Sequence, residues 1–147
     1  MGTGEAKREL VREFKGELPL GVSATATFCG GCLVVKGTAY ENDKDLGQRL
    51  AAADAFKDWQ VVGIHGAINY AISTEKFLWA TWTRFNPATD IYARSTTVKN
   101  NHIGYEAPIV IDARMKPWYP KVVEVREDIK RLVDERWGEY FPGKLSK

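Results

Sequence analysis

The sequence predicts an α/β domain built on a mixed sheet with flanking helices, and three features of its first half indicate this. Residues 21–28 alternate apolar and hydroxyl side chains, which is typical of a strand with one buried face. The Gly30-Gly31 pair then favours a tight turn into a second strand at 33–35. A helical segment over 43–56 leads to a third apolar strand at 61–64, and strands joined in this way pair in parallel. One sheet would therefore contain both parallel and antiparallel neighbours.

Two helices are expected in this first half. Apolar residues recur every four positions between 6 and 14, which predicts a short amphipathic helix over residues 4–15 that ends at Gly16. Asp43 is the expected N-cap of the second helix. The apolar stripe of that helix is predicted to comprise Leu46, Leu50, Ala53 and Phe56.

The second half contains two further helices and two short strands. Ser73 or Thr74 is expected to cap a helix that Pro87 stops, and a strand at 91–94 follows. The buried side of this helix is predicted to comprise Phe77, Leu78, Thr81, Trp82 and Phe85. A last apolar strand at 108–112 and a stiff connector at 116–120 precede the C-terminal helix, whose stripe comprises Ile129, Leu132, Val133, Arg136 and Tyr140.

Residues 95–106 follow neither the helical nor the strand period and are dense in hydrogen-bonding groups. We therefore predict a functional loop here. Its Thr96, Thr97, Lys99 and His102 are candidates for contact with a substrate or cofactor. His102 either moves protons near neutral pH or is merely solvated, and the sequence leaves both interpretations open.

Length and charge limit the classes of protein to consider. The chain has 147 residues, 44% hydrophobic and 27% charged, which suits one domain with one core. A net charge of +2, spread without blocks, gives no reason to expect a nucleic-acid or anionic-membrane partner. No uncharged run approaches the ~20 residues of a membrane span, and there are only two cysteines, so we expect a cytoplasmic protein. The aromatic content of 12% indicates surfaces buried against partner proteins.

Several motifs in the second half occur together. Leu78-Trp79-Ala80 is followed by Thr83-Arg84-Phe85-Asn86-Pro87 and then by Asp90. Ile111-Asp112-Ala113 and a Pro-Trp pair before a final helix with Trp137 lie downstream. In order and spacing this pattern resembles the C-terminal domain of the UbiD family of prenylated-FMN-dependent decarboxylases. The nearest branch is that of the phenylphosphate carboxylase subunits.

The resemblance spans residues 19–141, with 1–18 as an N-terminal helical segment and 142–147 as a tail. It departs from the family at residues 64–69, where an aspartate-rich strand end is replaced by Ile-His-Gly-Ala-Ile-Asn. Val110 and Arg114 also replace a glycine and a threonine of the family pattern. Any acidic role at the first of these strand ends is therefore missing here.

The resemblance implies a small subunit or domain of a carboxylase or decarboxylase that acts on aromatic or unsaturated acids. When carbon dioxide leaves such an acid, no side chain can accept the remaining electron pair, so a cofactor must. In the family this is prenylated FMN with a metal ion, held with the catalytic residues in an N-terminal region that nothing in this chain resembles. We therefore expect no catalytic residue and no cofactor on this chain alone. A larger UbiD-like subunit would hold both, in a homo- or hetero-oligomer, and this domain would form one wall of the active-site cleft.

Other residues have two interpretations each. Arg84 and Asp90 would either bind an anion or bond to each other across the turn at Pro87. Asp112 and Arg114 end an apolar strand, where α/β sheets bind ligands, but a strand-end Asp also caps loops. Trp79 and Trp82, three positions apart on one helix, cannot both face the same core stripe, so one is available to a partner.

Cys29-Gly-Gly-Cys32 is spaced for a metal ion or a disulfide, with His65 and His102 as further metal ligands. No second close pair of ligands accompanies it, so ordinary strand-end cysteines are the favoured interpretation. Two alternatives to the carboxylase subunit therefore remain. One is a non-catalytic assembly or ligand-binding module with the same fold, and the other is a Cys-x-x-Cys metal or redox protein.

Overall fold

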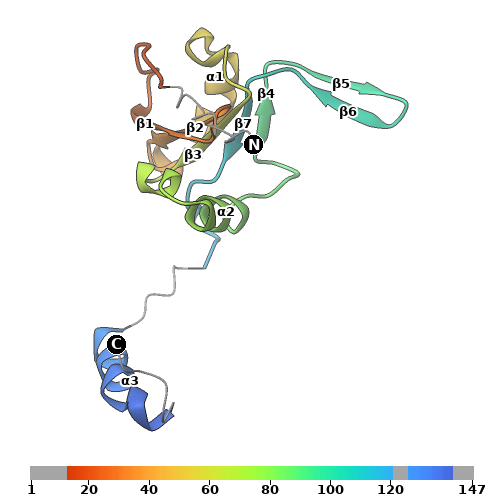
Figure 1. Ribbon diagram of the computed structural model, residues 1–147. Coiled ribbons are helices and arrows are strands. Elements are labelled where there is room, and N and C mark those ends of the chain that lie inside the picture. The colour runs from red at the N-terminus through yellow and green to blue at the C-terminus, as the bar shows by residue number, and fades with distance from the viewer. Residues whose placement is uncertain (1–12, 121–125, 141–147) are drawn as a thin grey trace, which may run out of the picture.

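The computed structural model describes residues 13–120 and 126–140. Its centre is a five-stranded sheet of order β1-β2-β3-β7-β4 (Figure 1). The strands are β1 (Val22–Phe28), β2 (Cys32–Gly37), β3 (Val61–His65), β7 (Ile109–Asp112) and β4 (Ile91–Ala93). β2, β3 and β7 run parallel, whereas β1 and β4 are antiparallel to their neighbours. The predicted mixed sheet and its parallel β-α-β unit are therefore confirmed.

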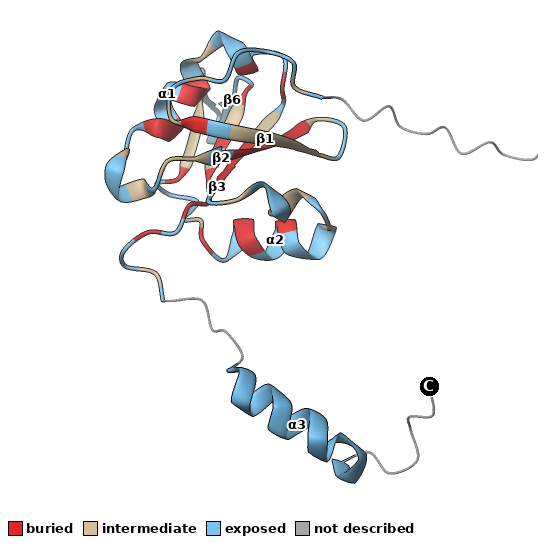
Figure 2. Cartoon of the chain, turned by 90° about the vertical axis from the view of Figure 1, so that its left-hand side faces the viewer, coloured by how far each residue is buried: buried red, intermediate tan, exposed pale blue. Residues whose placement is uncertain are grey.

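Helices cover both faces of the sheet. Figures 1 and 2 show α1 (Leu46–Ala52) on one side and α2 (Thr74–Trp82) on the other. Successive strand residues point to opposite faces, so both faces of the central strands are apolar. On β2, Leu33 and Val35 pack into the cluster beneath α1, whereas Cys32 and Val34 pack with Phe77 of α2.

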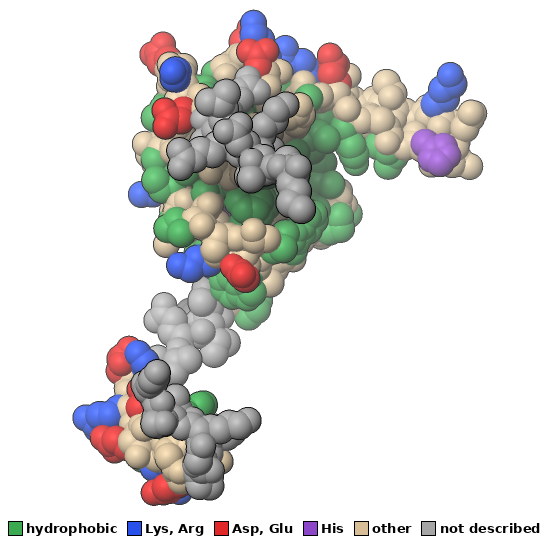
Figure 3. Space-filling model, viewed as in Figure 1, with side chains coloured by type: hydrophobic (Ala, Val, Ile, Leu, Met, Phe, Trp, Pro, Cys, Tyr) green, Lys and Arg blue, Asp and Glu red, His purple; other side chains and the backbone are tan. Residues whose placement is uncertain are grey.

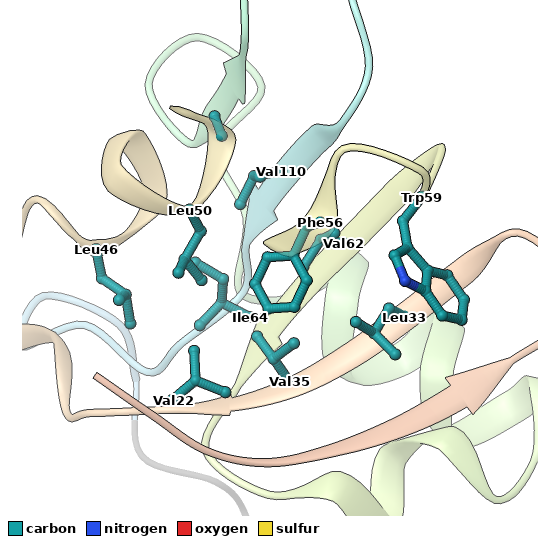
Figure 4. Close-up of a cluster of buried hydrophobic side chains, with 11 residues drawn as sticks. Val22, Leu33, Val35, Leu46, Leu50, Phe56, Trp59, Val62, Ile64 and Val110 are labelled. Carbon is teal, nitrogen blue, oxygen red and sulfur yellow. The ribbon is translucent and has the colours of Figure 1, made fainter. Parts of the chain in front are cut away.

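The larger core lies between the sheet and α1, where Figure 4 shows Ile64 and Val62 of β3 facing Leu50 and Phe56. These four side chains are at most 1% exposed. The helix approaches the sheet closely because Gly47 has no side chain, and a Cβ atom there would overlap the ring of Tyr92 on β4. A small residue at this position thus sets the distance between α1 and the sheet edge.

The start of α1 differs from the prediction. Asp45, and not Asp43, occupies the N-cap position, and no side chain caps the helix there. Both Asp43 carboxylate oxygens instead accept hydrogen bonds from Arg49, at 2.7 Å each. This contact lowers the pKa of Asp43. The helix ends at Ala52, and a 3-10 turn over Asp54–Phe56 continues the apolar stripe and buries Phe56.

Ser73 caps α2 as predicted, since its hydroxyl accepts a hydrogen bond from the backbone N–H of Lys76 at 3.2 Å. The predicted buried side is only partly correct. The buried residues are Phe77, Ala80 and Thr81, whereas Leu78 and Trp82 are exposed. The helix therefore packs on the sheet through a narrow face. Both Trp79 and Trp82 point outward, whereas only one of them was expected to.

The predicted loop at 95–106 is a β-hairpin, formed by β5 (Thr96–Lys99) and β6 (His102–Tyr105). Asn100 and Asn101 form its turn with φ of 52° and 62°, the left-handed conformation that two-residue hairpin turns require. Neither strand has a buried face, so the sequence shows no strand period here and the hairpin was not predicted. Figure 1 shows the hairpin projecting away from the sheet, and all of its strand residues are exposed.

The C-terminal helix α3 (Glu127–Tyr140) forms as predicted, and every one of its residues is exposed, as Figure 2 shows. The helix predicted over residues 4–15 lies mostly outside the described residues, and Glu13–Lys15 are not helical. Within the described ranges no helix has the length and apolarity to cross a bilayer.

The cluster beneath α1 should carry most of the stability of the domain. Ile64→Ala removes buried methyl groups at the centre of the sheet and should lower the free energy of unfolding by about 2–5 kcal/mol. Val98→Ala on the exposed hairpin is the control and should change it by less than about 0.5 kcal/mol. Urea denaturation of both variants measures the difference. Equal losses would show that the cluster is not the core of the folding unit.

Candidate functional site

The carboxyl ends of β2, β3 and β7 meet at one edge of the sheet, because these strands are parallel. Ligands of α/β proteins commonly bind at this edge. His65 ends β3, Asp112 ends β7, and the chain that follows supplies Arg114 and Lys116. All four side chains are at most 2% exposed. The edge is thus an unusually polar part of the interior.

Asp112 and Arg114 form a buried, two-pronged ion pair. Arg114 donates from Nε and Nη2 to the two carboxylate oxygens of Asp112, at 2.8 and 2.6 Å. Its Nη1 donates to the carbonyls of Thr38 and Asp43, both at 2.8 Å. The guanidinium thereby fastens the end of β7 to the segment that leads into α1. Both residues, proposed as ligand contacts or as a loop cap, are committed to this internal network.

Lys116 joins the same network from the other side. Its Nζ lies 2.9 Å from an Asp90 carboxylate oxygen and donates to the carbonyls of Asp112 and Arg84, at 2.8 and 3.2 Å. Asp90 also accepts a hydrogen bond from the backbone N–H of Asn86, which closes the turn at Pro87. The hypothesis that Arg84 pairs with Asp90 is therefore wrong. Lys116, from the chain after β7, is the partner of Asp90, and Arg84 contacts Tyr70 and Trp79 instead.

Arg84 lies beside α2 with a different set of neighbours. Its Nη1 donates to the Tyr70 hydroxyl at 3.0 Å, and its guanidinium lies 5.2 Å from the ring centres of both Tyr70 and Trp79. Arg84 is only 7% exposed. Within the described residues no carboxylate lies within ion-pair distance of it, since all the ion pairs there involve other cations.

His65 is buried between the sheet and α2. Its Nε2 lies 3.3 Å from the Thr81 hydroxyl, and its ring contacts those of Tyr70 and Phe77. Its Nδ1 is buried without a hydrogen-bond partner among the described residues. Burial first, and then the positive charge of Arg84, lower the pKa of His65 to about 4. The ring is therefore neutral at physiological pH.

The predicted contact residues are not brought together. β4 is antiparallel to β7, and Ala93 pairs with Ile109, so the hairpin leaves from the edge of the sheet opposite to Asp112. Thr96, Thr97, Lys99 and His102 lie on that hairpin, with Lys99 opposite His102. The sequence prediction missed Lys116 and Tyr70, because neither stands in a motif. A lysine four positions after a strand-end aspartate was the available signal for Lys116.

The cysteine pair does not favour a metal or redox role. Cys29 and Cys32 flank the turn between β1 and β2, and both are free thiols. Burial, together with the charge of Cys29, raises the pKa of Cys32 to about 12, which opposes the thiolate that metals and disulfide exchange require. Along the described chain no three His, Cys, Asp or Glu side chains gather to hold a metal ion.

The described residues do not fit prenylated FMN either. A flavin phosphate needs several basic or backbone N–H donors, but among the described residues Arg114 and Lys116 already pair with Asp112 and Asp90, which leaves Arg84 as the one unpaired buried cation. A surface hollow along α3 is lined by Lys130 and Arg131 but also by four carboxylates, so its net charge is negative and opposes a phosphate. A second hollow, beside β1 at Thr25 and Thr27, is lined by no cation.

The buried ion pair gives one prediction. Asp112→Asn leaves the guanidinium of Arg114 buried without its counter-charge and should lower the free energy of unfolding by about 3–5 kcal/mol. Asp54→Asn is the control, because it breaks an exposed pair with Arg94 and should cost at most about 1 kcal/mol. Urea denaturation compares them, and equal costs would contradict a structural role for Asp112.

His65 gives a second prediction. Its folded pKa of about 4 lies below the ordinary value of 6.5, so unfolding takes up a proton when the pH falls below 6.5. The free energy of unfolding should be independent of His65 above pH 6.5 and should decrease by about 3 kcal/mol as the pH falls to about 4. His65→Gln should remove this decrease, measured by urea denaturation across the range. His102→Gln, on the hairpin, should retain it, and identical pH profiles for both variants would refute the assignment.

No protein-family model matches the chain. It is 41% identical over 145 residues, 98% of its length, to a Chlamydia pneumoniae protein that is named as a subunit of 4-hydroxybenzoate decarboxylase. It is 36% identical over 143 residues, 97% of its length, to an uncharacterized protein of Chlamydia trachomatis. In both cases the match covers 24% of the relative, so the chain spans about a quarter of the length of these relatives.

The fold also has a counterpart among solved structures. The vanillic acid decarboxylase of Sedimentibacter hydroxybenzoicus in its closed form aligns with a TM-score of 0.50 and 16% identity. The alignment covers 84% of this chain and 29% of that one. At this identity the likeness concerns the fold alone. The 41% identity to the chlamydial protein and the motifs from Leu78 to Asp90 show that the chain belongs to the UbiD-like decarboxylase family.

Proposed function

We propose that this chain is the C-terminal-domain component of a UbiD-like carboxylase or decarboxylase that acts on aromatic or unsaturated acids. The observation that carries the proposal is the 41% identity, over 98% of the chain, to the chlamydial protein named as part of a 4-hydroxybenzoate decarboxylase. The chain contributes one wall of the active-site cleft and contacts between subunits. A larger UbiD-like polypeptide holds prenylated FMN, its metal ion and the catalytic residues.

The chemistry supports this division of roles. Decarboxylation of an unsaturated acid needs an electron sink, which only a cofactor supplies. Two of the three buried cations of the described residues are used internally, in the pairs of Arg114 with Asp112 and of Lys116 with Asp90, and Arg84 alone is too few for a cofactor phosphate. Residues outside this chain must then supply the sink. A wall of the cleft needs only a rigid edge, and this network makes the carboxyl edge of the sheet rigid.

The exposed apolar surface supports a role in contacts between subunits. On the hairpin, Val98 lies opposite Ile103 and Thr96 opposite Tyr105, so one face carries apolar side chains. Val98 is 72% exposed and Ile103 is 60% exposed. Large apolar side chains are also exposed on α2 and just before it, at Ile72, Leu78, Trp79 and Trp82. Figure 3 shows hydrophobic side chains gathered on this side of the body, below the hairpin. Contiguous apolar surface of this kind is typical of protein interfaces.

Reconstitution tests the proposal. The chain is mixed with the larger UbiD-like polypeptide from the same organism, loaded with prenylated FMN, and decarboxylation of 4-hydroxybenzoate and exchange of labelled carbon dioxide are followed. We expect a stable complex whose activity depends on the chain. Full activity without the chain would refute the proposal. Self-association without any flavoprotein complex would favour a non-catalytic assembly module instead.

The hairpin gives a matched pair of variants for the same assay. Val98→Glu places a charge on the apolar face and should weaken the complex at least about tenfold, because the carboxylate loses water on docking. Thr97→Glu places the same charge on the opposite face and should change the affinity little. Isothermal titration calorimetry measures both affinities. Equal losses in the two variants would show that the apolar face is not the contact surface.

A further inference from the structure

Arg84 is a nearly buried cation that the interior does not neutralise. The other two buried cations of this region each have a carboxylate, Arg114 through Asp112 and Lys116 through Asp90. With His65 neutral, three positive charges face two negative ones. A buried guanidinium without a counter-charge is costly. One further negative charge would balance the cluster.

The position of Arg84 is fixed from several sides. Its backbone carbonyl accepts a hydrogen bond from Lys116 Nζ, and its Nη1 donates to the Tyr70 hydroxyl. The rings of Tyr70 and Trp79 both lie against the guanidinium. A guanidinium held in this way loses little side-chain freedom when it binds a ligand, which favours affinity.

The unused donors of Arg84 can reach a ligand. Its Nε and Nη2 have no hydrogen-bond partner among the described residues. The one fully buried side-chain atom without a partner there is His65 Nδ1, so neither of these Arg84 atoms is fully buried. Nε and Nη2 are therefore accessible to solvent. These two atoms form the edge of the guanidinium that binds both oxygens of a carboxylate. Trp79 is 51% exposed, so it offers a flat apolar surface beside them.

We propose that Arg84, Tyr70 and Trp79 form a binding site for a carboxylate. A monoanion fits better than a phosphate, because one negative charge neutralises the buried cluster. The carboxylate belongs either to a free aromatic acid that stacks on Trp79 or to an aspartate or glutamate side chain of a partner polypeptide. The site belongs to this chain by itself and stands independently of the proposed function.

Titration of the full chain with small probes tests the site. Benzoate stands for a free aromatic acid, and N-acetylaspartate methylamide stands for a partner side chain. Benzamide and N-acetylasparagine methylamide are their uncharged controls, and inorganic phosphate is the competing anion. The indole N–H signal of Trp79 in a ¹⁵N-labelled sample reports binding. We expect one of the two carboxylates to shift it saturably, and the one that binds more tightly identifies the source.

Variants locate the binding. Arg84→Gln should weaken the preferred carboxylate at least about tenfold, because two charge-assisted hydrogen bonds are lost. Arg84→Lys keeps the positive charge but loses the two parallel N–H donors of the guanidinium, so it should bind with intermediate affinity. Arg49→Gln, at the exposed pair with Asp43, should bind as the unmodified chain does. Tyr70→Phe removes the hydroxyl that orients Arg84 and should also weaken binding. This variant serves as the test if Arg84→Gln fails to fold.

Three results would overturn the inference. The first is that neither carboxylate produces a saturable shift. The second is that Arg84→Gln and Tyr70→Phe bind the carboxylate as tightly as the unmodified chain does. The third is that phosphate or the uncharged amides bind as tightly as the carboxylates.

Discussion

The ion pair of Asp112 with Arg114 is the contact on which the arrangement of the domain depends. It joins the last strand of the sheet to the carbonyls of Thr38 and Asp43, which lie far away in the sequence. Buried charges of this kind contribute little net stability but tolerate few alternative arrangements. The pair therefore fixes how the sheet, α1 and the chain after β7 meet.

The same network explains why the carboxyl edge of the sheet is closed in this chain. In many α/β proteins this edge leaves polar groups free for a ligand. Here Asp112, Arg114, Lys116 and Asp90 satisfy one another, and Tyr40 lies over both Arg114 and Lys116. What stays open lies on the α2 side, around Arg84. The half-exposed Trp79 of α2 lies against the Arg84 guanidinium, so a polar contact and apolar packing are available on one surface.

The sheet could be predicted from the sequence because its signals are local. Alternation in β1, the glycine turn after it and the apolar runs of β2 and β3 each depend on a few neighbouring residues. The motif around Arg84 and Pro87 identified the family, but it could not name the partners of its charged residues. Arg84 and Asp90 are near in sequence, yet Asp90 pairs with Lys116, which reaches it only after the sheet has formed. The hairpin was missed because its residues have no buried face, and burial is what produces a readable period.

The separation of the hairpin from the core has a consequence for how the domain fluctuates. Two strands with every side chain exposed have no packed layer to hold them, and such a unit opens at a lower free energy than the sheet. Its backbone amides, from Thr96 to Tyr105, would exchange with solvent deuterium long before those of β3, while the rest of the fold stays intact. Slower exchange confined to these amides would then reveal that another surface has covered the hairpin, without any label or mutation in the domain.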